Sequence, residues 1–154
     1  MNYSLEEIIT FLKVHTGDEN LYAETDLHTG AGVDGDDFQE MIEGFSEKFL
    51  VDISQYRWYF HAGEEGFPLL GQFFFPPPYR QVKRIPVTPV ILLEIANQGK
   101  WNIIYPEHKI TEKRYDLIIN QIIAIAAGLF ILLILAIKYG SKYGFWSYVN
   151  QLSQ

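Results

Sequence analysis

The sequence contains no cysteine among its 154 residues, which excludes disulfide bonds, thiol catalysis and cysteine-ligated zinc. Basic residues are scarce in the first part of the chain, where residues 1–66 hold 15 acidic and 3 basic side chains. Acidic residues are absent after Asp116, where Lys138 and Lys142 are the only charged side chains. Because the acidic part would repel phosphates, we expect no nucleic-acid binding and favour partners with basic surfaces.

A recognisable set of catalytic residues is also lacking. The four histidines are scattered, and no pair has the spacing of metal ligands on a helix. His61 lies near Glu64 and Glu65 in the segment FHAGEEG, which would suit acid–base catalysis, although a loop histidine beside carboxylates is usually structural. No serine has the context of a nucleophile elbow, and no glycine-rich phosphate loop is present. We therefore expect a non-enzymatic protein without a cofactor.

Four acidic side chains follow Val33 within seven residues: Asp34, Asp36, Asp37 and Glu40. Carboxylates of this density would offer oxygen ligands to a hard cation such as Ca²⁺. However, no glycine stands where an EF-hand loop requires one, and the terminal glutamate is misplaced. A solvated acidic helix start is therefore favoured over a metal site.

One long stretch of the chain is apolar. Residues 117–137, LIINQIIAIAAGLFILLILAI, are 21 positions without a charge. A helix of that length spans about 31 Å, close to the hydrocarbon thickness of a bilayer. A domain this small would hardly bury a helix that is apolar all round, so we predict one transmembrane helix. The aromatic residues and lysines of the 138–154 tail suit a membrane interface.

The charges around this stretch predict its orientation. Lys109, Lys113 and Arg114 precede it, and Lys138 and Lys142 follow it. The first residues, MNYSLEEIITFLKVH, are acidic and lack a long apolar core, so we expect no signal peptide. Both features place the N-terminal domain in the cytoplasm.

Two amphipathic helices are expected in residues 1–66. Ser4 and Glu7 form a capping box before a helix at 5–15, which Gly17 ends. A polar loop with Leu21 and Leu27 as core anchors leads to a second helix at 36–49. Its core face holds Phe38, Met41, Ile42, Phe45 and Phe49. Its opposite face is acidic and holds Asp36, Glu40, Glu43 and Glu47.

Residues 67–116 are expected to form an irregular extension rich in aromatic residues and proline. The three prolines at 76–78 exclude helix and strand interiors there. Short edge strands are possible structures for residues 58–61 and 72–75. Thr88 and Pro89 begin a third helix at about 89–98, and Gly99 ends it. The basic segment YRQVKR contains Arg80, Lys83 and Arg84, which suit either anionic lipid or the acidic domain.

The stretch from Ser4 to Tyr56 resembles acyl carrier proteins. Such carriers have a Thr-Asp-Leu-like loop anchor, matched here at 25–27, and an Asp-Ser-Leu motif that opens an acidic helix. That helix ends in a Glu-Glu-x-Phe-like sequence before an isoleucine, mirrored here by Glu47, Lys48, Phe49 and Ile53. Counting back from Phe49 places Asp34 on the motif's aspartate and Gly35 on its serine. The segments GVDGDD and VTPVILLEIANQGKW are similar to a bacterial family of carrier-like domains of unknown function. The resemblance implies a mostly α-helical, carrier-like domain of a bacterial protein. The transmembrane stretch lies outside the resemblance, and we expect it to attach this domain to the inner membrane.

In carriers the motif's serine receives the phosphopantetheine arm, and Gly35 has no atom that would accept it. We expect Asp34 or Asp36 to cap the second helix instead, with Gly35 supplying backbone freedom. The favoured function is a membrane-anchored interaction or regulatory module whose partner-binding residues are the acidic face. The alternative is an accessory protein of fatty-acyl or lipid metabolism that carries no arm.

Overall fold

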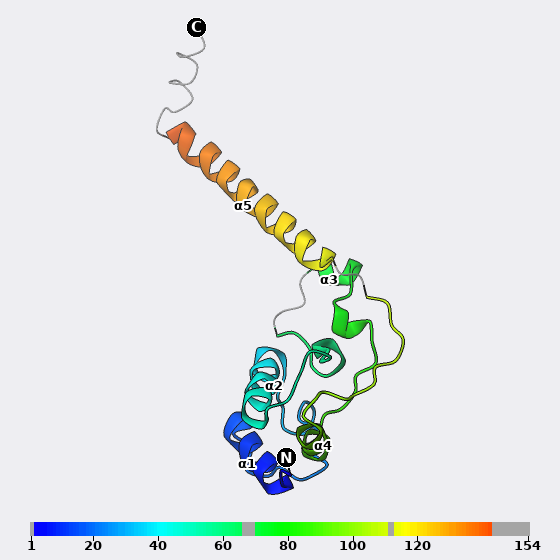
Figure 1. The fold of residues 1–154 in the computed structure, drawn as a ribbon. Helices are drawn as coiled ribbons and strands as arrows, with labels where there is room; N and C mark the ends of the chain where they lie inside the picture. Colours follow the sequence, from blue (N-terminus) through cyan, green and yellow to red (C-terminus); the bar gives the residue numbers. More distant parts are fainter. Residues whose placement is uncertain (1, 66–69, 111–112, 143–154) are drawn as a thin grey trace. The chain divides into compact units, whose positions relative to one another are not determined.

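The computed structural model describes residues 2–65, 70–110 and 113–142, and these residues are mostly helical (Figure 1). The helices are α1 (Leu5–Thr16), α2 (Gly35–Phe49), α3 (Gly71–Phe74), α4 (Pro89–Gln98) and α5 (Tyr115–Lys142), with short 3₁₀ turns η1 (Trp58–Phe60) and η2 (Pro78–Arg80). The chain divides into two compact units. One comprises Met1–Phe67 with Pro77–Glu112, and the other comprises Pro68–Pro76 with Lys113–Gln154.

The ends of the helices follow from local sequence. The Ser4 side chain accepts a hydrogen bond from the Glu7 N–H, and the Glu7 carboxylate accepts one from the Ser4 N–H at 2.7 Å. Gly17 and Gly99 end α1 and α4 with left-handed backbones. At α4 the Thr88 hydroxyl accepts a hydrogen bond from the Ile91 N–H. The predicted ends of the first and third helices are therefore confirmed to within one residue.

Helices α1, α2 and α4 surround one apolar core in the first unit. The apolar face of α2 is buried as predicted, with its five side chains at most 3% exposed. The loop anchors Leu21 and Leu27 are buried against the same core. Helix α4 contributes Leu92, Ile95 and Ala96, so residues from the 1–66 and 67–116 ranges share this core.

Two contacts join α4 to the beginning and middle of the chain. The Asn97 amide pairs with the Tyr3 backbone, accepting its N–H at 2.7 Å. After α4, a single parallel bridge joins Asp52 to Lys100, with the Trp101 N–H donating to the Asp52 carbonyl at 2.8 Å. These contacts stabilise the end of α4 beside the segment that follows α2.

The two possible edge strands are wrong. Residues 58–60 form η1, and Phe60, His61 and Ala62 are buried one after another. A strand would have turned alternate side chains outward, so consecutive burial requires a tighter backbone. Residues 71–74 form α3, where the Phe75 N–H donates to the Gly71 carbonyl at 2.9 Å. No strand is found in the described residues.

Helix α5 contains the predicted transmembrane stretch. Residues Tyr115–Gly140 form one helix long and apolar enough to cross a membrane, and none of its apolar window is buried in the protein. The predicted span at 117–137 lies within it. The part of the aromatic tail at 143–154 lies outside the described residues.

Candidate functional site

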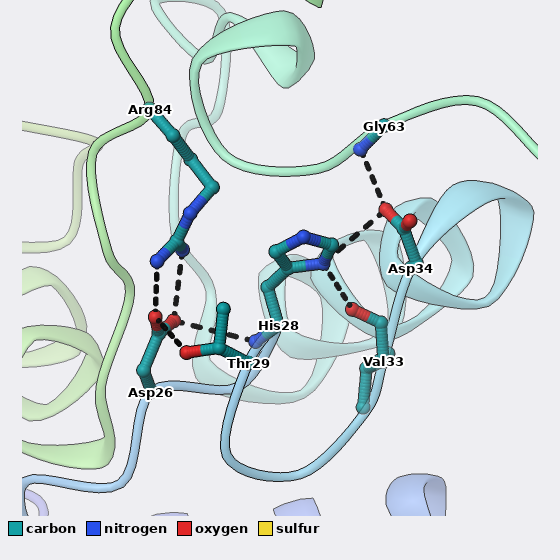
Figure 2. A network of polar contacts seen from close by, with 7 residues as sticks. All are labelled: Asp26, His28, Thr29, Val33, Asp34, Gly63 and Arg84. Carbon is teal, nitrogen blue, oxygen red and sulfur yellow. Dashed lines mark hydrogen bonds and ion pairs between the residues drawn. The ribbon is translucent and has the colours of Figure 1, made fainter.

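The first feature of the candidate site is the start of α2. Asp34 occupies the N-cap position with an extended backbone (φ −142°, ψ 176°), but its side chain makes no capping hydrogen bond. Asp36 lies inside the first turn and so is not the cap either. The prediction that one of these carboxylates caps α2 is therefore wrong. Asp34 Oδ1 instead accepts the Gly63 backbone N–H at 2.5 Å, which ties α2 to a distant loop (Figure 2).

His28 lies beside Asp34 in the same loop. Its Nδ1 atom is 3.2 Å from the Val33 carbonyl oxygen and 3.3 Å from Asp34 Oδ1 (Figure 2). Both neighbours are acceptors, so the proton belongs on Nδ1, from which it donates to them. A carboxylate beside a histidine also orients the base of hydrolytic triads. Here, however, no hydroxyl group contacts Nε2 within the described ranges.

Asp26 binds Arg84 across the loop. Both Oδ atoms of Asp26 accept hydrogen bonds from the Arg84 guanidinium, and the Thr29 hydroxyl donates to Oδ2 at 2.7 Å (Figure 2). Burial raises the pKa of the Asp26 carboxyl, but the hydrogen bonds from Arg84 and Thr29 outweigh it and leave the pKa below its usual value. Asp26 is therefore a charged anchor that fixes the loop to the segment before α4.

Gly35 has a left-handed backbone (φ +53°) at the position that resembles the carrier serine. A Cβ atom added there would overlap the side chain of Glu65. A serine at this position would therefore be strained by its backbone and would have to displace the exposed Glu65 side chain. Gly35 therefore offers no hydroxyl group to which an arm could be attached.

The acidic face of α2 is turned to solvent. Asp36, Glu40, Glu43 and Glu47 are all exposed. None of the four forms an ion pair with any described residue, and Glu43 alone accepts a hydrogen bond, from Gln39 at 2.9 Å. Their charges are therefore available to a partner.

His61 is fully buried and serves the core. Its Nδ1 lies 2.9 Å from the Ile85 carbonyl oxygen, and its Nε2 lies 2.9 Å from the Tyr105 hydroxyl. Tyr105 in turn accepts the Trp101 indole N–H at 2.7 Å. These partners fit a neutral ring with its proton on Nδ1. Burial lowers the pKa of His61 to about 4, which keeps it neutral at pH 7.

Sequence reasoning missed the partners that the fold supplies. Gly63 lies 29 residues from Asp34, and Tyr105 lies 44 residues from His61, so no short motif joins them. Of the basic segment, Arg84 pairs with the acidic domain, whereas Arg80 and Lys83 are exposed. In the described ranges no three histidine or carboxylate side chains gather as metal ligands.

Comparison with known proteins gives one family. The family model described as "Protein of unknown function (DUF1493)" matches residues 2–105, which include the whole candidate site. No curated protein and no solved structure matches the chain significantly. None of these comparisons links the chain to acyl carrier proteins.

Proposed function

The chain belongs to the DUF1493 family of proteins of unknown function, and we propose that it is a non-enzymatic, membrane-anchored interaction module. It presents the acidic face of α2, formed by Asp36, Glu40, Glu43 and Glu47, to a basic surface of a partner protein.

The observation that carries this proposal is that the four carboxylates are exposed and unpaired within the described chain. They extend over about 16 Å of helix, since each residue rises about 1.5 Å. The nearby basic residue does not neutralise them, because the Lys48 ammonium lies over the rings of Phe11 and Phe49. Like charges held together repel one another, and a basic partner would relieve that repulsion.

The acidic face is also held rigidly. The opposite side of α2 is buried in the core, and Asp34 fixes its first residues to Gly63. A preorganised charged surface loses little conformational entropy when a partner binds. The resemblance to acyl carriers supports the same mode of binding, because carriers dock on their enzymes through an acidic second helix.

The membrane anchor of this proposal is α5. The basic residues Lys109, Lys113 and Arg114 before it favour a cytoplasmic N-terminal domain, and the family resemblance favours the bacterial inner membrane. An accessory role in fatty-acyl or lipid metabolism is the second form of the proposal. It would follow if the basic partner is an enzyme that uses carrier proteins.

A charge reversal tests the proposal. The full chain with Glu40→Lys, Glu43→Lys and Glu47→Lys is compared with the native chain by affinity purification in mild detergent. A matched control reverses Glu6, Glu24 and Glu94, which are exposed, lie on other segments and make no ion pair with any described residue. Both variants change the net charge equally, so only the position of the charges differs.

We expect the α2 reversal to lower recovery of the partner roughly tenfold or more, and the control to retain it. Recovery with the native chain should also fall as salt rises, because exposed charges chiefly steer the encounter. Thermal melts should stay close to native, since substitutions on an exposed face rarely change stability by more than about 0.5 kcal/mol. Full recovery with the α2 reversal, or equal loss with the control, would overturn the proposal.

A further inference from the structure

The segment Leu70–Phe75 exposes an unusual amount of apolar surface. Leu70, Phe73 and Phe74 are 58%, 76% and 72% exposed, and Phe75 is 42% exposed. Continuous apolar patches of this kind on a protein surface mark binding to a membrane or to another protein. Residues 70–78 carry no charge, so burying this segment would not require the desolvation of a charged side chain.

This segment is attached to the beginning of α5, within the same compact unit. The Gly71 backbone N–H donates to the Asn120 side-chain oxygen at 2.8 Å. A Cβ atom added at Gly71 would overlap the Asp116 carbonyl oxygen, so only glycine allows the two backbones to approach so closely. The Phe75 and Tyr115 rings also lie in contact, with centroids 5.5 Å apart.

The contact lies at the polar end of the apolar helix. Asp116 is 2% exposed and accepts hydrogen bonds from Arg114 at 2.9 Å and 2.7 Å, and no charge follows until Lys138. Asn120 stands four residues beyond Asp116, about 6 Å further along the helix. If α5 crosses the bilayer, Gly71 is therefore held at the depth where headgroups meet acyl chains. Phenylalanine and leucine side chains form the apolar face of helices that lie at that depth.

We propose that Leu70–Phe75 is a second membrane contact, which inserts Leu70, Phe73, Phe74 and Phe75 into the bilayer interface beside α5. The occupant of this apolar surface is lipid, because the segment is attached to the start of α5, whose apolar side chains are themselves exposed along the possible membrane span. The proposal rests on the membrane anchoring by α5 proposed above.

The backbone of the segment suits this environment. The Phe73 N–H donates to the Leu70 carbonyl at 3.2 Å and the Phe75 N–H donates to the Gly71 carbonyl at 2.9 Å, while Gly71 uses Asn120. Lipid offers no partner to backbone groups, so internal pairing lowers the cost of insertion. Because the first compact unit lies on both sides of this segment in sequence, insertion would tether that unit to the membrane at a second point.

The absence of cysteine allows a clean test with single spin labels on the full chain. Three variants are each labelled with a nitroxide: Phe74→Cys, Leu129→Cys in α5, and Val14→Cys as a control. Val14 is an apolar residue of α1 that is 78% exposed, close to the exposure of Phe74. The proteins are placed in vesicles of phosphatidylethanolamine and phosphatidylglycerol (3:1 as a working composition of roughly bacterial charge). Power saturation then compares access of oxygen, which concentrates in lipid, with access of a water-soluble nickel chelate.

We expect the label at 74 to favour oxygen over the nickel chelate, at a depth between the label at 14 and the label at 129. Equal nickel access at 74 and 14, with 129 in lipid, would overturn the interfacial contact while leaving the anchor intact. Protection of 74 from both reagents would also overturn it. Dipolar broadening would then identify a second copy, and its absence would identify burial within the chain. Nickel access at 129 would instead overturn the anchor itself. None of these outcomes bears on the capture of a basic partner by α2.

Discussion

At Gly35 a left-handed backbone and the neighbouring Glu65 side chain disfavour any residue with a Cβ atom. The position resembles that of the serine that carries phosphopantetheine, but it has neither the hydroxyl nor the conformation that a serine favours. The loop around it is held by Asp26 and Asp34 through tertiary contacts and by His28 through a local contact with the Val33 carbonyl. These contacts fix the shape of the loop.

We expect the native chain to gain no mass when it is incubated with a phosphopantetheinyl transferase and coenzyme A. Gly35→Ser should also remain unmodified, because the left-handed backbone and the Glu65 side chain disfavour a serine at this position. Gly35→Ser and the control Gly35→Ala should each lose about 1–2 kcal/mol of stability, the cost of a left-handed backbone for a residue with a Cβ atom. Intact-mass spectrometry and denaturant melts measure both effects. An added arm on the native chain would refute the first expectation, and unchanged melts would refute the second.

A second prediction at this scale concerns the buried His61. Its pKa is lowered from 6.5 to about 4 in the folded state, so between these values the unfolded chain binds more protons. Stability therefore rises with pH through this window, is fully present above about pH 6.5, and is lost as the pH falls toward 4. The shift corresponds to about 3 kcal/mol.

The measurement is an NMR titration of the His61 ring in detergent, together with melts of the native chain and His61→Gln. The ring signal should not titrate above pH 5. The pH dependence of stability between 6.5 and 4 should be weaker in the variant, and equal slopes would contradict the assignment. If the variant does not fold, the ring titration alone decides the question.

At the scale of elements, each of the longer helices pairs one buried or attached face with one exposed face. Helix α2 buries its phenylalanines and exposes its acids, and α5 exposes a continuous apolar surface. The short α3 depends on α5, because four residues make too few internal hydrogen bonds to be stable alone. Its attachment through Asn120 is therefore the point at which it is most easily loosened.

We expect Asn120→Ala to free the Leu70–Phe75 segment, because the Gly71 N–H loses its acceptor at a cost of about 1–3 kcal/mol. The nitroxide at position 74 should then give narrower, more mobile spectral lines. Gln121→Ala is the matched control, since that adjacent amide is exposed. Equal line widths in native chain and Asn120→Ala would show that this hydrogen bond does not hold α3.

At the scale of the whole molecule, the charges are divided between an acidic first part and an apolar helix that carries no acid after Asp116. A net excess of carboxylates favours exposure of the first part to water, whereas residues 122–137 of α5 carry no polar side chain that would favour water. This division supports one anchored module in which α2 faces the aqueous side.

We expect arginine at Ala127, near the centre of α5, to cost about 2.5–3.5 kcal/mol of insertion free energy. The inserted fraction in a translocon assay should fall for Ala127→Arg and rise or stay equal for the control Ala127→Leu. An unchanged fraction for the arginine variant would argue that α5 does not occupy the bilayer core.

The orientation of the anchor is tested separately. A reporter fused after Gln154 should be active on the periplasmic side, because three basic residues (Lys109, Lys113 and Arg114) precede the apolar stretch 117–137 and two (Lys138 and Lys142) follow it. A cytoplasmic signal from that fusion would reverse the topology and leave insertion itself in place. The acidic face of α2 would then have to meet its partner outside the cytoplasm.

Local and compositional features of this protein are determined by its sequence alone. The capping box at Ser4, the glycines after α1 and α4, and the apolar face of α2 all act over three or four residues, and all were predicted. The apolar helix follows from composition, because length and lack of charge are what a bilayer requires. The exposure of the acidic face follows from the same helical periodicity.

The tertiary structure decided how the polar groups are partnered. Asp34 has the sequence of a helix cap, yet the Gly63 N–H, 29 residues away, takes its carboxylate. Asp26 meets Arg84 across 58 residues, His61 meets Tyr105 across 44, and Gly71 meets Asn120 across 49. Such pairings depend on which segments are brought together by the packing of the core and of α5. The separation of two residues along the chain does not show whether they meet in space. For the same reason, residues 58–60 form a 3₁₀ turn followed by consecutive burial at 60–62, where an edge strand had been a possible structure.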